Sequence, residues 1–199
     1  MKLLIATQNA GKIRELEAIL APLGVTLSTP EEFLEVPEAI EDGETFEENA
    51  LKKARHWFMA TGLPTLADDS GLMVDALDGE PGVRSARYAP TVEERNAKLL
   101  AALEGILPER RTARFVCVAV FIRGHGDEVI RRGTCEGRIH SEPRGDGGFG
   151  YDPIFWVEGH GCTMAELPAQ VKNQISHRAR ALAALQPDLI EWVKTSRRG

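Results

Sequence analysis

Two adjacent acids between apolar segments are the feature that most restricts how this chain can fold. A short, mostly apolar run after Pro64 ends in Asp68 and Asp69, and apolar residues resume after Ser70-Gly71. The run predicts a strand that ends at the pair. Neighbouring like charges call for a metal ion, a lysine or an arginine that neutralises them, but Asp-Asp-Ser-Gly is also favourable turn chemistry. A solvated turn and a cation site therefore both stay open at this point.

Bulk composition is that of an ordinary globular domain. The 199 residues, 43% of them hydrophobic and 27% charged, suit one domain over residues 1–199 that buries a real core. Two lobes around a cleft are compatible with this length. The formal net charge of -6 argues against binding to long DNA or RNA, for which a dominant basic surface is expected. A small anionic ligand held by a few local cations remains compatible with it.

The cysteines and the apolar runs indicate a reducing, cytoplasmic location. Cys117, Cys135 and Cys162 are odd in number and have no C-x-x-C spacing, so neither a disulfide framework nor a zinc site is indicated. We expect reduced, mostly buried thiols. No run approaches the roughly 18 apolar residues of a membrane span, and neither a signal peptide nor a lipidation motif is recognisable. We therefore expect no association with a membrane.

The N-terminal part is predicted to alternate strands and helices. Residues 2–7 are a continuous apolar run typical of a buried strand, and residues 13–23 carry apolar side chains at helical spacing. A short strand at 25–27 and an exposed, acid-rich loop at 31–42 follow.

A capped helix is predicted next. Thr45 and Glu48 have the spacing of a capping box at its start. Pro64 then begins the strand that leads to the acidic pair, and residues 72–77 predict a further, separate strand.

The middle of the chain predicts a helix and a hairpin. Thr91 and Glu94 form a second capping-box pattern. Residues 114–122 and 128–139 predict two strands joined by a glycine-containing turn, an arrangement typical of an antiparallel pair.

The C-terminal part begins with a segment at 142–153 that is too glycine-rich for a regular element, and a short apolar run follows at 154–157. The remainder is predicted to be helical. Ser176 is a candidate cap, and Pro187 is predicted to open a last helix.

The loop after the first predicted strand has the features of a phosphate site. Its sequence, Thr7-Gln8-Asn9-Ala10-Gly11-Lys12, lies between a strand and the start of a helix, where free N–H groups and the helix dipole favour an anion. Lys12 adds charge. The loop is not a Walker A loop, because the first glycine and the terminal Ser or Thr of that motif are absent. An Asn-capped helix start without a ligand is the alternative.

Other charged residues are candidates to complete such a site. Lys52 and Lys53 lie near the apolar face of the predicted helix after Thr45; most lysines at such positions are solvated, but Lys53 can neutralise phosphate oxygens or the acidic pair. Glu41 can join one of the two aspartates in the small carboxylate set typical of magnesium. That ion keeps several waters and takes other ligands from substrate phosphates.

The glycine-rich segment offers a place for a flat ligand. Phe149 stands between two glycines, so a base can stack on its ring; a core position beneath a flexible loop is the alternative. A cluster near a predicted helix start consists of Lys172, Ser176, His177 and Arg178. Ordinary surface charge is the alternative for that cluster.

Five stretches, taken in order, resemble one known family. They are T-Q-N-A-G-K at 7–12, E-D-G-E-T-F-E-E-N-A at 41–50, A-D-D-S-G at 67–71, G-G-F-G-Y-D-P at 147–153 and I-S-H-R at 175–178. K-K-A-R-H at 52–56 and P-G-V-R-S-A-R-Y at 81–88 extend the match. Each motif alone is weak, but their order and spacing together are specific. The chain resembles the inosine triphosphate pyrophosphatases, a family that hydrolyses non-canonical purine nucleoside triphosphates.

The resemblance implies an α/β fold in which a long mixed central sheet and flanking helices form two lobes around a nucleotide-binding cleft. It also implies Mg2+ as cofactor, a purine nucleoside triphosphate as substrate, and a homodimer. Asp69 would be the catalytic proton acceptor, and Glu41 and Asp69 would bind the metal, with Asp68 as an additional candidate. The implied substrate-binding residues are Thr7, Gln8, Asn9, Ala10, Gly11, Lys12, Lys53, Ser70, Phe149, Gly150, Tyr151, Asp152, Lys172, His177 and Arg178.

The implied reaction is attack of water on the α-phosphorus of ITP, dITP or XTP, which releases pyrophosphate and a nucleoside monophosphate. Positioning and charge neutralisation supply most of the catalysis in phosphoryl transfer. Two other classes of function stay open. One is another metal-dependent enzyme, either a Maf-like nucleotide pyrophosphatase or a phosphomonoesterase; the other is a nucleotide-binding regulator without turnover.

The geometry of the acidic pair adds a further expectation. Neighbours on a regular strand point to opposite faces, so both acids line one pocket only if the backbone turns at Ser70-Gly71. Otherwise one acid faces the ligand and the other is structural. The resemblance assigns the ligand-facing role to Asp69.

Overall fold

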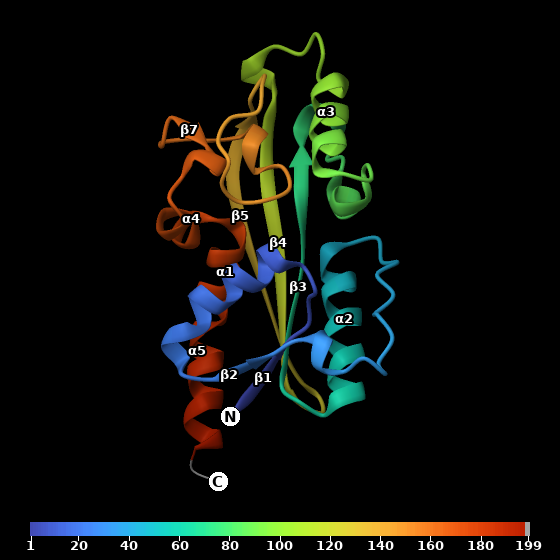
Figure 1. The fold of residues 1–199 in the computed structure, drawn as a ribbon, viewed down its shortest axis with the longest axis vertical. Helices are drawn as coiled ribbons and strands as arrows, with labels where there is room; N and C mark the ends of the chain where they lie inside the picture. Colours follow the sequence, from blue (N-terminus) through green and yellow to red (C-terminus); the bar gives the residue numbers. More distant parts are fainter. Residues whose placement is uncertain (198–199) are drawn as a thin grey trace. The chain divides into compact units, whose positions relative to one another are not determined.

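A computed structural model describes residues 1–197, and its strands form one seven-stranded sheet of order β2-β1-β3-β4-β5-β6-β7 (Figure 1). The strands are β1 (Lys2–Ile5), β2 (Thr26–Ser28), β3 (Thr65–Val74), β4 (Thr112–Gly124), β5 (Asp127–Ile139), β6 (Phe155–Val157) and β7 (Cys162–Thr163). The α-helices of the described residues are α1 (Ala10–Leu20), α2 (Phe46–Thr61), α3 (Val92–Ala102), α4 (Ala169–Ile175) and α5 (His177–Ser196). Strand β1 is parallel to β2 and β3, whereas β6 is antiparallel to β5 and β7. The predicted α/β class with a mixed sheet and flanking helices is confirmed.

Two compact units make up the fold, and each has its own apolar core. The first unit consists of Met1–Asp69, Cys117–Gly133 and the described chain from Arg178 onward, and the second consists of Ser70–Val116 and Thr134–His177. Strands β3, β4 and β5 contribute residues to both units. A single domain over residues 1–199, with two lobes around a cleft, stays a prediction.

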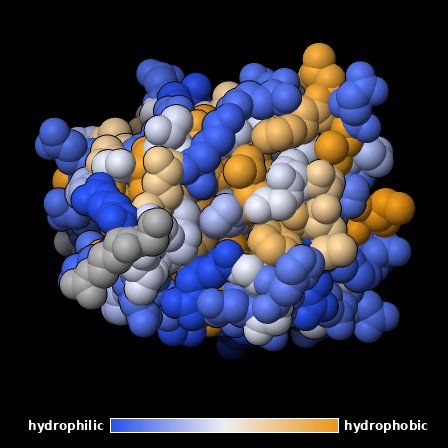
Figure 2. All heavy atoms as spheres, turned by 90° about the horizontal axis from the view of Figure 1, so that it is seen from below, coloured by the Kyte–Doolittle hydropathy of each residue, from blue (hydrophilic) through white to orange (hydrophobic). Residues whose placement is uncertain are grey.

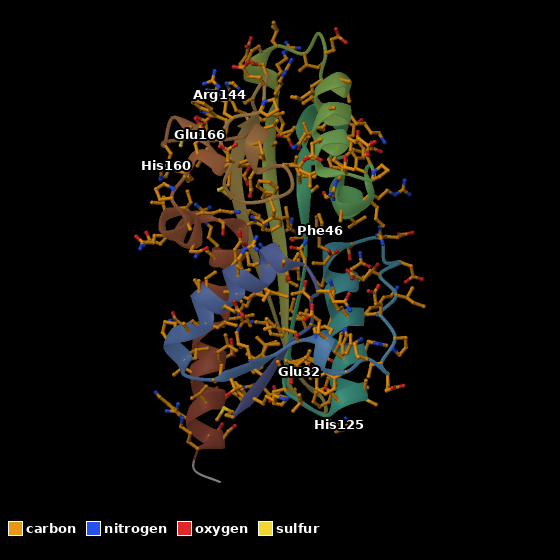
Figure 3. The ribbon with its side chains drawn as sticks, viewed as in Figure 1. Glu32, Phe46, His125, Arg144, His160 and Glu166 are labelled. Atoms are coloured by element: carbon orange, nitrogen blue, oxygen red, sulfur yellow. The ribbon has the colours of Figure 1, made fainter. Side chains whose placement is uncertain are left out.

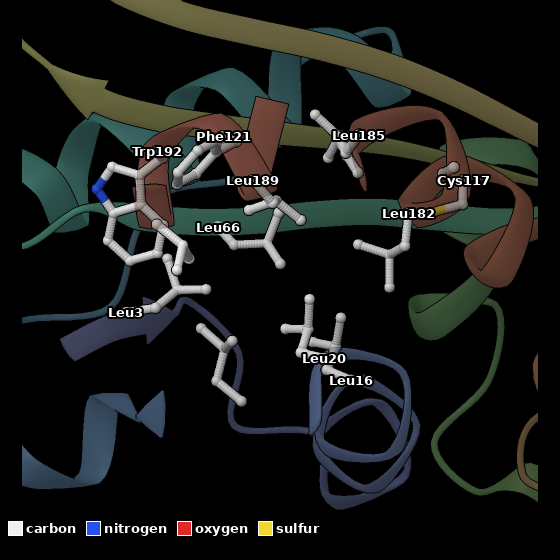
Figure 4. Packing of buried hydrophobic residues seen from close by; sticks show 14 residues of the cluster. Leu3, Leu16, Leu20, Leu66, Cys117, Phe121, Leu182, Leu185, Leu189 and Trp192 are labelled. Carbon is white, nitrogen blue, oxygen red and sulfur yellow. The ribbon is translucent and has the colours of Figure 1, made fainter. Parts of the chain in front are cut away.

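The core of the first unit lies between helices and strands. Helices α1 and α5 lie on one side of the strands of this unit, and α2 lies on the other (Figure 1). Leucines of α1 and α5 pack on side chains from β1, β3 and β4 (Figure 4). Each fully buried leucine of this kind contributes about 1.5–3 kcal/mol to folding. The buried residues of the cluster are Leu3, Ile5, Leu16, Leu20, Leu66, Cys117, Ala119, Phe121, Ala181, Leu182, Leu185, Leu189, Trp192 and Val193.

The core of the second unit is richer in aromatic side chains. Leu99 and Leu103 of α3 belong to the same cluster as Phe115 and Phe155. The ring centroids of Phe115 and Phe155 are 4.4 Å apart, so the two rings are in close contact.

The glycine-rich segment of the second unit lies against the residues that follow β7. The Gly147 N–H donates to the carbonyl of Ala165 at 3.0 Å, and the Thr163 hydroxyl donates to the carbonyl of Arg144 at 2.8 Å. Arg144 and Glu166 extend from these segments (Figure 3). A Cβ on Gly147 would lie 2.6 Å from the Ala165 oxygen, so the close approach of the two backbones requires glycine there.

Helix α2 begins with half of the predicted capping box. The Thr45 hydroxyl accepts the Glu48 N–H at 3.1 Å, as predicted, but the Glu48 carboxylate accepts the N–H of Glu44 rather than that of Thr45, at 2.8 Å. Phe46 at the start of the helix and His125 in the β4–β5 turn are labelled in Figure 3. The ring of His125 meets that of Phe58 edge to face at 5.3 Å, which ties the turn to α2.

The predictions for the middle of the chain are confirmed. Helix α3 has the complete capping box of Thr91 and Glu94. Strands β4 and β5 are neighbours in the sheet and are joined by only His125 and Gly126, a connection that fits antiparallel strands alone.

The prediction that the strand ends at the acidic pair is wrong. Strand β3 continues through Asp68 and Asp69 to Val74, so the pair lies in mid-strand and the solvated-turn interpretation is also excluded. The separate strand predicted at 72–77 is the end of β3 followed by a 3-10 turn at Asp75–Leu77. The register of β1 with β3 ends at Leu66, so the other neighbour of β3 in the sheet, β4, is the strand whose pairing favours its continuation through the pair.

The prediction that Pro187 opens a last helix is wrong as well. Pro187 lies inside α5, which begins at His177, directly after Ser176. A proline in a helix interior costs about 3 kcal/mol. The apolar stripe of α5 continues on both sides of it, with Leu185 and Leu189 buried in the core of the first unit. Burial of that stripe outweighs the cost of the proline.

The thiols and the surface agree with the composition. No disulfide joins the three cysteines; Cys117 and Cys135 are buried and Cys162 is half-buried, which confirms the prediction for these residues. The face shown in Figure 2 is mostly hydrophilic, with apolar side chains interspersed. Across residues 1–197, no helix has both the length and the apolar character needed to cross a membrane.

Replacement of Pro187 by alanine is expected to stabilise the protein. Pro187 is exposed, so the change leaves the core intact and restores a helical N–H donor. We expect the free energy of unfolding to rise by about 1–3 kcal/mol, measured as a shift of the urea midpoint. Gln186→Ala, at the exposed neighbouring position, is the control and should change the midpoint little. A lower midpoint for Pro187→Ala would show that α5 requires the proline.

Candidate active site

The parallel register of β1 and β3 brings the predicted phosphate loop to the acidic pair. Ile5 is opposite Leu66, and the Ala6 N–H donates to the Leu66 carbonyl at 2.8 Å. The loop that follows β1 therefore starts at the level where β3 carries Asp68. Two segments that are 56 residues apart in the sequence meet there, since Lys12 Nζ lies 3.4 Å from the Asp68 carbonyl oxygen.

The loop itself is an Asn-capped helix start. The Asn9 side chain accepts the Lys12 N–H at 3.0 Å, and the Thr7 hydroxyl accepts the Asn9 N–H at 3.2 Å. Gln8 and Ala10 are exposed. The first N–H groups of α1 have no acceptor within the helix, and the dipole places partial positive charge there. The cap occupies one of these groups, the Lys12 N–H, and does not involve those of Ala10 and Gly11, so phosphate binding stays a prediction.

Asp68 is the centre of a buried ion cluster in the first unit. Its Oδ2 lies 3.0 Å from Lys12 Nζ and 3.1 Å from Arg178 Nη2. Arg178 also forms an ion pair with Glu15. The exposed fractions of Asp68 and Arg178 are 3% and 1%, so these charges are almost fully removed from water. The Cys117 thiol donates to the same Oδ2 at 3.8 Å.

The charges of this cluster keep Asp68 ionised. Burial alone would raise the pKa of Asp68, but the positive charges of Lys12, Arg178 and Lys53 outweigh it and hold the pKa well below its usual range. The second carboxylate oxygen, Oδ1, is buried and has no hydrogen-bond partner among residues 1–197. Asp68 is thus ionised in the folded protein, and only one of its two oxygens is bonded to the cations of the cluster.

Asp69 has the opposite electrostatic environment. Burial raises its pKa, and the charges of Lys12 and Lys53 and a hydrogen bond from Asn49 oppose this only in part, while the nearby Glu41 carboxylate raises the pKa further. Lys53 pairs with Glu41 at 2.8 Å and donates to the Asp68 carbonyl at 3.0 Å. Glu41, Lys53 and Asp69 are therefore neighbours in the first unit.

The side chains of the two aspartates lie on opposite faces of β3. Asp68 meets α1 and α5 through Lys12 and Arg178, whereas Asp69 meets α2 through Asn49. This is the alternation expected of a regular strand. The backbone does not turn at Ser70-Gly71, so the expectation that only one acid faces a ligand fits the observed geometry.

The cluster has the composition of a cation site. Within residues 1–197, no three His, Cys, Asp or Glu side chains are gathered as ligands of one metal ion. The charged side chains contain one more carboxylate than cation, and a cation beside Asp69 would offset the burial that raises its pKa. A magnesium ion needs only one or two carboxylates when water and phosphate complete its shell, so the residues fit that ion. The charged members are Glu15, Glu41, Asp68, Asp69, Lys12, Lys53 and Arg178.

The second unit holds a separate group of predicted site residues. Lys172 and Asp152 form a buried ion pair at 2.6 Å, and the same carboxylate oxygen of Asp152 accepts the Phe149 N–H at 2.8 Å. Lys172 Nζ lies 4.8 Å from the centroid of the half-buried Phe149 ring. A Cβ on Gly148 would lie 2.1 Å from the Asp152 carboxylate, so this position requires glycine. The loop is thereby shaped around one ion pair.

Further contacts fix the same loop. The Asn96 side chain donates to the Gly150 carbonyl at 3.2 Å, and the Tyr151 hydroxyl donates to the Ser85 carbonyl at 2.9 Å. Tyr151 is buried in the core of the second unit, so its ring has a structural role there. His177 stacks on Phe115 with 4.8 Å between ring centroids.

The comparisons with known proteins decide the family. The sequence profile of the Ham1 family matches residues 3–188. The chain belongs to the Ham1 family. A relative from Geobacter sulfurreducens named dITP/XTP pyrophosphatase is 54% identical over 194 residues, which cover 96% of this chain and 97% of the relative. A relative of the same name from Lactiplantibacillus plantarum is 51% identical over 192 residues, covering 96% of this chain and 95% of its own.

Solved structures of Ham1 proteins have the same fold. A HAM1 protein from Coxiella burnetii is 46% identical with a TM-score of 0.87, over 96% of this chain and 99% of its own. The Ham1 protein from Staphylococcus aureus is 39% identical with a TM-score of 0.84, over 95% of this chain and 98% of its own. The resemblance found in the sequence motifs is thus confirmed.

The predicted site residues of this Ham1 protein divide between the units. The first unit holds Thr7, Gln8, Asn9, Ala10, Gly11, Lys12, Glu41, Lys53, Asp68, Asp69 and Arg178, and the second holds Ser70, Phe149, Gly150, Tyr151, Asp152, Lys172 and His177. The roles of these residues stay predictions.

Four polar residues that contact the predicted set were not identified from the sequence: Glu15, Asn49, Ser85 and Asn96. Asn49 carried a usable signal, because it is a polar residue on the otherwise mostly apolar buried face of α2.

Loss of the Asp68 charge is expected to destabilise the metal-free protein in a pH-dependent way. Asp68→Asn leaves Lys12 and Arg178 undercompensated, which costs about 3–5 kcal/mol when a buried pair is broken. The folded pKa is lowered, so the carboxylate contributes stability above the unfolded pKa of about 3.9 and loses it as the pH falls below that value. The difference in unfolding free energy between wild type and variant should be largest at pH 7 and should decrease below about pH 4.

The measurement is urea unfolding in buffer with EDTA. Glu158→Gln, which removes an exposed carboxylate paired with Arg138 at 3.4 Å, is the matched control and should change stability by less than about 0.5 kcal/mol. A difference in unfolding free energy that stayed constant from pH 7 to pH 3 would contradict the lowered pKa of Asp68.

Proposed function

We propose that this Ham1 protein hydrolyses non-canonical purine nucleoside triphosphates, namely ITP, dITP and XTP, to the nucleoside monophosphate and pyrophosphate. Such a reaction removes these nucleotides from the nucleotide pool. The observation that carries the proposal is the cluster of the first unit, in which Asp69 and Glu41 lie beside Lys12 and Lys53. The name dITP/XTP pyrophosphatase of the relatives supports the choice of substrate.

Magnesium is the cofactor that we propose, with Glu41 and Asp69 as its protein ligands and Asp68 as an additional candidate. When bound, the ion would neutralise phosphate charge and lower the pKa of a bound water. Support for the ion comes from the excess of carboxylates in the cluster. The Asp68 oxygen without a hydrogen-bond partner among the described residues supports only the candidacy of Asp68.

The side chains of the first unit have separate tasks in the proposed reaction. Lys12 and Lys53 neutralise phosphate oxygens, and the N-terminal N–H groups of α1 bind a phosphate through the loop at residues 7–12. Asp69 accepts the proton of the water that attacks the α-phosphorus. The motif resemblance supports this role; the raised pKa of the metal-free carboxyl does not, because the cation proposed beside Asp69 would offset it. Most of the rate enhancement comes from positioning and charge.

Side chains of the second unit recognise the base in this proposal. The ring of Phe149 stacks on the purine, with Gly150, Tyr151 and Asp152 lining the pocket for base and sugar, and Ser70 and His177 adding contacts. An ammonium group such as that of Lys172 only donates, so it pairs with the oxygen at position 6 and not with the amino group of adenine. Arg178, which the motif resemblance assigns to the base, is engaged with Asp68 and Glu15 in the first unit.

A cytoplasmic homodimer is the location and assembly that we propose. The free thiols support a reducing compartment. The dimer rests on the resemblance of the sequence motifs to the family alone.

A substrate panel tests the function. Purified protein is incubated with ITP, dITP, XTP, ATP or GTP and magnesium, and both pyrophosphate and monophosphate are measured. We expect turnover of the first three and discrimination against ATP of up to about 10⁴-fold, because a site built for a 6-oxo group leaves its donors unpaired with adenine. EDTA should abolish the turnover.

Other outcomes of the panel assign other functions. Equal turnover of ATP, or release of orthophosphate alone, would refute the proposal. Hydrolysis of pyrimidine nucleotides or sugar phosphates instead would indicate a Maf-like enzyme or a phosphomonoesterase. Tight nucleotide binding without any turnover would indicate a regulator.

The roles of the two aspartates separate in single variants. Asp69→Asn should reduce kcat by at least about 10²-fold, the lower end of what a positioned base contributes, without loss of folding. Asp68→Asn should chiefly reduce stability, as described above. If Asp68→Asn abolished turnover in folded protein while Asp69→Asn did not, the assignment of the base would be reversed.

A further inference from the structure

One buried carboxamide connects the two segments that carry the proposed metal ligands. Asn49 lies on the buried face of α2 and is 1% exposed. Its Oδ1 accepts the Gly43 N–H at 2.8 Å. The same carboxamide lies beside the Asp69 side chain in β3, where it acts to lower the pKa of that carboxyl. Glu41 stands two residues before Gly43, so Asn49 is in contact with both the loop of one ligand and the side chain of the other.

The two contacts of Asn49 use different atoms. Because Oδ1 accepts from the backbone of Gly43, the Nδ2 group is the one left to donate to Asp69. An N–H donor pairs with an ionised carboxylate and restrains its orientation. The contact to Gly43 therefore determines which end of the carboxamide faces Asp69.

Gly43 is fitted to this arrangement by space rather than by backbone conformation. The backbone of Gly43 does not have a positive φ, so an alanine can adopt the same backbone conformation. A Cβ at this position would lie 2.8 Å from Asn49 Oδ1 and 2.8 Å from Glu48 Cβ. A side chain on residue 43 would thus push against the carboxamide that holds the loop.

Lys53 joins the same two segments by charge. It lies one helical turn beyond Asn49 on α2, where residues four apart are neighbours. Its ammonium group pairs with Glu41 at 2.8 Å and donates to the Asp68 carbonyl at 3.0 Å. One turn of α2 therefore connects the Glu41 loop to β3 twice, once through a neutral amide and once through a cation.

We propose that Asn49 is a positioning residue for hydrolysis, which holds the Glu41–Gly43 segment and the Asp69 carboxylate in a fixed mutual arrangement. The inference rests on the function proposed above. Asn49 does not touch the substrate; it acts through Glu41 and Asp69. In the proposed function Lys53 also neutralises phosphate oxygens of the substrate. Asn49 has no such second role, so its carboxamide acts only on the positions of Glu41 and Asp69.

Three variants separate this role from a merely structural one. Asn49→Ala removes both contacts and should lower kcat for dITP by about 10- to 100-fold, as loss of partners behind metal ligands does. It should also speed hydrogen exchange of the Gly43 N–H in metal-free protein. Asn49→Asp keeps an acceptor for Gly43 but loses the donor to Asp69, so it should retain slow exchange and still have a low kcat. Thr45→Ala is the matched control.

The control removes the cap of α2 at Thr45 without touching Asn49. It should lower the thermal midpoint but leave kcat and Gly43 exchange unchanged. If Asn49→Ala behaved like Thr45→Ala, with wild-type kcat at a lower midpoint, the inference would be overturned.

A double-mutant cycle with Gly43→Ala provides an independent test. Gly43→Ala alone should lower kcat, because its Cβ displaces the carboxamide. Combined with Asn49→Ala it should lower kcat by less than it does alone, since only the contact with Glu48 remains; such non-additivity is the signature of residues that act through one another. Effects that multiply would contradict the inference.

A failure of the proposed function has a different signature. If wild-type protein does not hydrolyse dITP, the proposed function is refuted. Calorimetric titration of nucleotide-free protein with MgCl2 then tests whether Asn49 positions Glu41 and Asp69. Asn49→Ala should weaken magnesium binding by about 10- to 100-fold relative to wild type and Thr45→Ala. Equal affinity in all three proteins would overturn the inference.

Discussion

Neutralisation of the buried Asp68 carboxylate is the interaction on which the first unit depends. A strand in the middle of a sheet can carry a charge through the core only if opposite charges reach it, and Lys12 from α1 and Arg178 from α5 do so at 3.0 and 3.1 Å. Both helices are thereby tied to β3 at the level of the acidic pair. A buried network of this kind is weak evidence for stability, because desolvation offsets the attraction, but it fixes a single arrangement.

The parallel pairing of β1 and β3 brings the other residues of the candidate site to the level of Asp68. It places the helix start at residues 10–12 beside Asp68, and the alternation of β3 turns Asp69 toward α2, where Asn49 lies and Lys53 and Glu41 pair. Two acids that are adjacent in the sequence therefore receive partners from different helices. The cations that serve the ion cluster are the same ones that we assign to phosphate, so the fold and the site share their charges.

The sequence was sufficient for what depends on local pattern and insufficient for what depends on distant partners. Thr91 with Glu94, the β4–β5 hairpin and the Asn9 cap follow from neighbouring residues and are confirmed. The continuity of β3 beyond Leu66, where its register with β1 ends, depends on its other neighbour β4, and Pro187 is tolerated because a core formed by other segments covers its helix. The ion pair of Asp68 with Arg178 joins residues 110 apart, which no local pattern reveals.

The contrast between the two aspartates follows from the same distribution of charge. Asp68 has three cations around it and a lowered pKa, so it is a poor proton acceptor and a constant source of negative charge. Asp69 is less well compensated, stands near another carboxylate and has a raised pKa, so it is the more basic of the two. Paired titratable groups whose environments drive their pKa values apart commonly divide an electrostatic role from a proton-transfer role. In the metal-free protein Asp69 is therefore the acid of the pair whose charge is the less compensated, and the one whose ionised form a cation bound beside it would stabilise more.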